Sequence, residues 1–241
     1  MSENIINYNT DNTTDNNTDN NTDNNTDNNI DNNTDNNTNN NTNNTSDNTA
    51  DNTTDFISDN YSVCRMNNWS LDCESQLNSQ INKELTASIA YHQLYSFFNR
   101  DNIGYKNIAN YFNKSSLEER EHANKFMEYQ NLRGGTVELD IIQPVGNNIL
   151  KLFNNTQDKS SLLLGFEFAL WLEQDVYQSL LILHKTADLC DDPAFCDLIE
   201  SDFLKEQLEA INELATYISQ LKNIGNDGYG LFAFDKSFEN K

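Results

Sequence analysis

Beyond about residue 70, the apolar and aromatic positions of the chain recur in alternating steps of four and three residues. This is the period of a helix that packs one face against partner helices. It predicts four long helices, at about 72–99, 106–133, 161–189 and 193–223. A short segment, 231–238, contains three Phe and has room for two helical turns, so it needs a surface to dock against. We therefore predict an all-α protein built on a four-helix bundle.

Residues that favour helix ends stand at the borders of these stretches. They are Ser70 or Asp72 before the first helix, Gly134–Gly135 after the second, Ser160 or Ser161 before the third, and Asp192 with Pro193 before the fourth. The short link 101–105 makes the first two helices antiparallel neighbours. The long link 136–159 predicts an irregular crossover, with a helical turn at 149–153, which makes the third helix parallel to the second.

Each apolar face is interrupted near the middle of its helix by one polar side chain. These side chains are Glu84, Glu119, Glu173 and Gln207, and His122 follows Glu119 on the same face. Because all four lie close to mid-height, they meet at one level of the bundle whichever way each helix runs. The sequence therefore predicts a single polar site inside the bundle.

Two interpretations of this site compete. A buried polar network can fix the register of the helices without further chemistry. However, three carboxylates and one imidazole, with no Lys or Arg on these faces, repel one another unless a cation neutralises them. The Glu-x-x-His spacing of Glu119 and His122 is weak alone, but it is the ligand spacing of carboxylate-bridged metal pairs. Carboxylates with a single His suit iron or manganese better than a structural zinc site.

The sequence resembles the ferritins, specifically the catalytic heavy-chain type. The resemblance rests on the phrases INKELTAS, NYFNKSSLEEREHANKFMEYQNLRGG, LEQDVYQSLLILHK and DDPAFCDLIESDFLKEQ, and it covers residues 71–223. It implies a ferritin-like four-helix bundle with a long crossover and a short fifth helix, assembled with copies of itself or in a mixed shell of 24 subunits. It also implies storage of iron as a ferric mineral and ferroxidase activity, the oxidation of Fe(II) by dioxygen at two irons per subunit.

The resemblance assigns roles to the interrupting residues. Glu84, Glu119 and His122 would bind the first iron, Glu119 would bridge to the second, and Glu173 would bind the second. Gln207 would hold a ligand water or oxygen species.

Further residues match positions around the centre and the entry route. Tyr91 and Glu118 match neighbours of the iron pair, and Asp197 and Glu200 match the acidic lining of three-fold channels. Without the resemblance, Asp197 and Glu200 are equally well explained as first-turn acids favoured by the helix dipole.

Two other classes of protein remain open. Di-iron oxygenases and peroxide-reducing bundles carry two Glu-x-x-His motifs, whereas position 204, three before Gln207, is Leu. A shell protein with an inactive site would be favoured by loss of Glu84 or Glu173, and both are present.

Composition divides the chain into two parts. Residues 1–60 are an Asn/Asp/Thr-rich tract with eleven Asp, one Glu and no Lys or Arg, which predicts disorder. Residues 61–241 can form one domain. The net charge of −23 favours cations as partners and argues against nucleic acid and anionic membranes. We find no secretory signal, no membrane span and no zinc-like spacing among four Cys, and expect a cytoplasmic protein with reduced thiols.

Overall fold

The structure, a computed structural model, describes residues 62–142, 153 and 160–239, and all regular secondary structure in these residues is helical. The elements are α1 (Leu71–Phe98), α2 (Lys106–Leu132), α4 (Ser161–Leu189), α5 (Pro193–Leu198), the π-helical segment η1 (Ile199–Leu204), α6 (Lys205–Ile224) and α7 (Gly228–Lys236). None of the described helices is long and apolar enough to cross a membrane. The predicted tail 1–60 lies outside the described residues, so that boundary stays a prediction.

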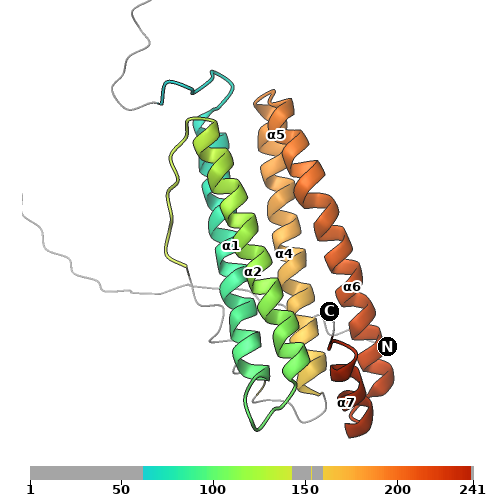
Figure 1. The fold of residues 1–241 in the computed structure, drawn as a ribbon. Helices are drawn as coiled ribbons and strands as arrows, with labels where there is room; N and C mark the ends of the chain where they lie inside the picture. Colours follow the sequence, from blue (N-terminus) through green and yellow to red (C-terminus); the bar gives the residue numbers. More distant parts are fainter. Residues whose placement is uncertain (1–61, 143–152, 154–159, 240–241) are drawn as a thin grey trace, which may run out of the picture. The chain divides into compact units, whose positions relative to one another are not determined.

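The described helices form the predicted four-helix bundle with a short C-terminal helix (Figure 1). Helices α1 and α2 are antiparallel and pack along each other, and α4 packs against α1 and α6. Helix α4 runs parallel to α2, as the long crossover predicted, and α5, η1 and α6 return in the opposite direction. Of the predicted turn at 149–153, only Phe153 is described, and it is helical.

The capping residues act as their chemistry predicts. The Ser70 hydroxyl accepts the Cys73 N–H at 3.1 Å, and Ser160 and Asp192 cap α4 and α5 in the same way. Helix α2 is followed by Gly134 at φ +72°, where a side chain would be strained and would lie 2.8 Å from the Arg65 nitrogen. Only glycine fits both the turn and this close approach.

The short helix α7 docks through an aromatic cluster and one buried carboxylate. Phe238 packs its ring 4.9 Å from that of Tyr217 and 5.9 Å from that of Phe166. Asp235 accepts the backbone N–H groups of Asn107 and Ile108 at 3.1 and 3.0 Å. These are free N–H groups of the first turn of α2, whose own N-cap makes no side-chain hydrogen bond. Helix α7 therefore caps α2 while it covers the end of the core.

Two details differ from the sequence prediction. The fourth helix was expected to be continuous, but η1 interrupts it with a wider π turn, which lets Phe195, Ile199, Phe203 and Gln207 all face the core at steps of four. On α2, the alternating steps of four and three, counted from Ile108, predict that Ser115 and Tyr129 face the core, whereas Ser116 and Gln130 are buried. Steps of three and four are hard to order from sequence alone.

Candidate metal centre

The interruptions predicted on the four helices meet inside the bundle. Glu84 comes from α1, Glu119 and His122 from α2, Glu173 from α4 and Gln207 from α6. Glu84 has no solvent-exposed surface, and none of the others exceeds 9% exposure. Amphipathic packing delivers each side chain here, since each occupies a core position of its helix.

The three residues on α1 and α2 form a compact set of ligand atoms. One potential ligand atom from each of Glu84, Glu119 and His122 lies within 4.8 Å of the others. The Glu119 Oε2 atom is 3.3 Å from His122 Nδ1, as their spacing of three residues on one helix allows. Among the described residues this is the one group of three or more acidic, His or Cys side chains that has this geometry.

Glu84 is held by one oxygen and leaves the other without a partner. Its Oε1 accepts the Gln80 amide at 2.7 Å, and the Ser179 hydroxyl donates to the other end of the same amide. Its Oε2 is buried and meets no hydrogen-bond donor among the residues that the structure describes. A buried carboxylate oxygen without a donor is costly, so this atom fits a cation that would complete its environment.

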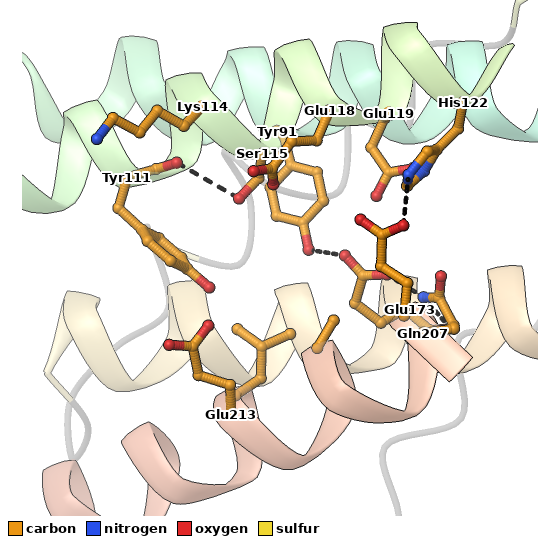
Figure 2. Close-up of a pocket in the computed structure, with 13 residues that line it drawn as sticks. Tyr91, Tyr111, Lys114, Ser115, Glu118, Glu119, His122, Glu173, Gln207 and Glu213 are labelled. Atoms are coloured by element: carbon orange, nitrogen blue, oxygen red, sulfur yellow. Dashed lines mark hydrogen bonds and ion pairs between the residues drawn. The ribbon is translucent and has the colours of Figure 1, made fainter. Parts of the chain in front are cut away.

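We call Glu84 with His122 the first pole of the site and Glu173 the second. The Tyr91 hydroxyl donates to the Glu173 carboxylate, as Figure 2 shows. The Gln207 amide donates both to that carboxylate and, at 3.0 Å, to the Glu173 backbone carbonyl. Tyr91 and Gln207 are therefore in contact with Glu173 and orient it.

Glu119 interacts electrostatically with the carboxyl groups of both Glu84 and Glu173. Loss of water on burial, and then repulsion from the neighbouring carboxylate, raises the pKa of Glu84 and of Glu119. Burial also raises the pKa of Glu173, although hydrogen bonds from Tyr91 and Gln207 oppose the change. The site therefore favours bound protons or a cation over three bare carboxylates.

A cavity of about 340 Å³ opens onto Glu119, His122 and Glu173 (Figure 2). Its wall carries further carboxylates, namely those of Glu118, Glu206 and Glu213. Glu206 Oε2 lies 3.5 Å from His122 Nε2, and burial, with repulsion from Glu206, raises the pKa of Glu118. The route into the site is therefore acidic and suits a cation.

Sequence reasoning missed Gln80, Glu206 and Glu213. Gln80 stands four residues before Glu84 on the same face, and Glu206 and Glu213 are two turns apart on α6. These spacings were the available signals.

Asp197 and Glu200 lie apart from the buried centre. Both are exposed and, with Asp188, Asp191 and Cys196, they line a separate depression. Glu200 Oε1 contacts His184 Nε2 at 2.6 Å. The structure brings these acids together but does not join them to Glu84 or Glu173.

Residues 74–224 match the family model of the ferritin-like domain. The chain belongs to the ferritin family. Its relatives include Ferritin-2, chloroplastic, of Zea mays (48% identity over 68% of this chain and 64% of the relative) and the chloroplastic ferritin of Phaseolus vulgaris (45%, 69% and 63%). Ferritin-4, chloroplastic, of Arabidopsis thaliana is 44% identical over 74% of this chain and 66% of its own. The chain thus spans slightly less than two thirds of these curated ferritins.

The comparison contradicts the predicted cytoplasmic location. Four relatives at 44–48% identity are all named chloroplastic ferritins. The prediction rested on the lack of a secretory signal and of a membrane span, and neither feature reports on import into a plastid.

Proposed function

We propose that this ferritin is an iron-storage protein of the heavy-chain type, with ferroxidase activity. It oxidises Fe(II) with dioxygen at the mid-bundle site and keeps the product as a ferric mineral inside a shell of 24 subunits. The observation that carries the proposal is the buried set Glu84, Glu119 and His122, with Glu173 on the far side of Glu119. The names of its relatives support iron storage and a plastid location.

In this proposal the two poles hold the two iron ions of one reaction as substrates. Glu84 and His122 bind the first, Glu119 bridges, and Glu173 binds the second. Gln207 and Tyr91 keep the Glu173 carboxylate aimed at the site through the hydrogen bonds described above. Carboxylate oxygens favour hard cations, and they stabilise Fe(III) more than Fe(II) because the charge is higher.

Two bound Fe(II) ions match the electron demand of the reaction. Each gives up one electron, and two electrons with two protons reduce dioxygen to hydrogen peroxide. The protons that the buried carboxyls release on iron binding are one local source. The acidic wall formed by Glu118 and Glu206 attracts iron from the cavity, and Asp197 and Glu200 would do the same at a channel between subunits.

The structure favours this activity over that of a di-iron oxygenase. Such enzymes place a second Glu-x-x-His pair in the bundle. Here α6 contributes Gln207, and the residue three positions earlier is the half-buried Leu204. The second pole therefore lacks an imidazole and binds its iron more weakly, which suits release of the oxidised product.

The test replaces both α2 ligands. Glu119→Ala with His122→Ala should lower the initial rate of aerobic Fe(II) oxidation by at least about 100-fold, because even outer-shell partners of metal ligands contribute 10–100-fold. The matched control, Arg120→Ala with Glu121→Ala, changes exposed residues of the same helix and should keep the rate. Light scattering should report a shell for all three proteins. Unchanged oxidation in the first variant, or a monomeric wild type, would contradict the proposal.

A further inference from the structure

Two cysteines far apart in the sequence lie together at one end of the bundle. Cys73 is in the first turn of α1, and Cys190 is the C-cap of α4. Neither forms a disulfide. We infer that Cys73 and Cys190 form a peroxide-reactive thiol pair, which hydrogen peroxide converts into a disulfide between α1 and α4. This inference requires no iron and goes beyond the proposed function.

Shared hydrogen-bond partners hold the two thiols together. The Thr186 carbonyl accepts the Cys73 thiol at 3.9 Å and the Cys190 N–H at 3.2 Å. The Ser70 hydroxyl accepts the Cys73 N–H at 3.1 Å and lies 3.0 Å from the Cys190 sulfur. The pKa of Cys73 is raised in part by the thiol of Cys190, so the two side chains are neighbours. A disulfide therefore requires these neighbouring sulfur atoms to approach each other to bonding distance.

The two thiols differ in access, which sets the order of their reactions. Cys190 is half-buried, whereas Cys73 has no exposed surface. Burial, and then the neighbouring Cys190, raises the pKa of Cys73 to about 11. Peroxide therefore meets Cys190 first. The hydroxyl of Ser70 uses its oxygen to cap α1, so its proton is available to stabilise charge on the Cys190 sulfur.

The reaction balances with one peroxide for each pair. The Cys190 sulfur attacks one peroxide oxygen and the O–O bond breaks, so that Cys190 becomes a sulfenic acid and the other peroxide oxygen leaves as water. The Cys73 sulfur then attacks the sulfenic sulfur and displaces its hydroxyl group as a second water. Two thiols thus lose two electrons and two protons, and peroxide takes them up.

The other two cysteines lack this arrangement. Cys64 is exposed and contacts the Ser62 hydroxyl at 3.2 Å. Cys196 lies in the acidic depression, where burial and the carboxylate of Asp188 raise its pKa. They provide the matched control for the experiment.

The experiment treats the full-length reduced protein with hydrogen peroxide in the presence of a chelator and counts thiols after unfolding. The count should fall from four to two, and the chain should lose two hydrogen atoms in mass without gaining oxygen. Trypsin leaves Cys190 and Cys196 on one peptide, 186–205. The disulfide is therefore mapped in the Cys64→Ser, Cys196→Ser variant, which keeps only Cys73 and Cys190. After oxidation, a disulfide should link peptides 66–83 and 186–205, and no free thiol should remain.

A single variant tests the order of attack. Cys73→Ser should leave Cys190 as a sulfenic acid that a dimedone probe captures, with no disulfide within the chain. If Cys73→Ser does not fold, the disulfide mapping in the variant that keeps only Cys73 and Cys190 still tests the inference. Oxygen uptake without a cross-link in that variant, or a disulfide between chains, overturns it. Iron oxidation plays no part in any readout, so the proposed function stands or fails separately.

Discussion

At the scale of single residues, Glu84 explains how a carboxylate can be both anchored and available. The Gln80 amide occupies one oxygen, and the other is buried with no donor from the described part of the chain. Because Ser179 fixes the far end of the amide, Gln80 cannot turn away without losing a second bond. The network thus fixes one oxygen of Glu84 and leaves the other for a further ligand. Outer partners of this kind orient metal ligands and tune their affinity.

Replacement of Gln80 by Met tests this role. Met has a similar shape but donates no hydrogen bond, so Glu84 should rotate among positions and bind a cation about 10-fold more weakly. Calorimetric titration with Zn(II), which is not oxidised, measures the affinity directly. Ser179→Ala should give a smaller loss in the same direction, because it removes support for Gln80 alone. Equal affinity in the Gln80→Met variant and the wild type would exclude a positioning role.

The residues of the site differ in how well sequence could predict them. Glu119 and His122 were predictable because they are three residues apart and interrupt the same apolar face of one helix. Glu84, Glu173 and Gln207 followed from the common mid-height of the interruptions. Gln80 and Glu206 were missed, since a polar residue beside a helical face has the same pattern whether it bonds a ligand or faces water.

At the scale of elements, η1 controls the register between the two ends of the fourth helix. A π turn holds more residues than an α turn, so the extra residue rotates everything before it relative to α6. This rotation lets Phe195 and Ile199 be buried together with Phe203 and Gln207. It also fixes the direction in which Asp197 and Glu200 face.

Deletion of Ser201, which is exposed within η1, should convert the π turn into a regular α turn. A regular α-helix would turn α5 by about 100° and expose Phe195 and Ile199. Loss of two buried apolar side chains should cost about 3–6 kcal/mol of unfolding free energy and lower the melting temperature by roughly 10 °C or more. Circular dichroism measures the change, and Ser201→Ala is the control with intact register. A deletion variant that melts with the wild type would show that η1 has no such role.

Periodicity predicted the helices well and their tertiary contacts less well. The bounds of α1, α2 and α4 follow from caps such as Ser70, Ser160 and Gly134, which act within a few residues. The capping of α2 by Asp235 joins residues more than 120 positions apart, and no local signal marks it. The π turn was missed because a run of buried residues at steps of four also occurs on ordinary helices.

At the scale of the whole molecule, a chain with net charge −23 gathers three of its buried carboxyl groups, those of Glu84, Glu119 and Glu173, at one site of the bundle. The acidic composition favoured a partner of positive charge only in general terms; the site itself required the fold. Without a cation, the raised pKa values of these groups favour their protonated forms. Cation binding, proton release and stability are therefore coupled through Glu84, Glu119 and Glu173.

This coupling predicts how stability changes with pH. Below about pH 4 the three carboxyls are protonated in both the folded and the unfolded chain. As pH rises through the ordinary value of 4.5, the unfolded chain ionises while the bundle keeps its protons, because the folded pKa values are raised. The free energy of unfolding of the cation-free protein should therefore fall with rising pH, by up to about 1.4 kcal/mol per unit for each group.

Thermal melts between pH 5 and 8 in the presence of a chelator measure this slope. Exposed acids also contribute, so the control is Glu119→Gln with Glu173→Gln, which keeps the shapes and removes two titrations. The variant should show a shallower fall. Zn(II) at about 100 times its dissociation constant should then stabilise the wild type by about 2.7 kcal/mol at pH 8, and by less at pH 5, where protons compete. The variant should gain little at either pH. Parallel slopes for the two proteins would mean that the buried carboxyls do not retain protons, and the electrostatic basis for cation binding would be lost.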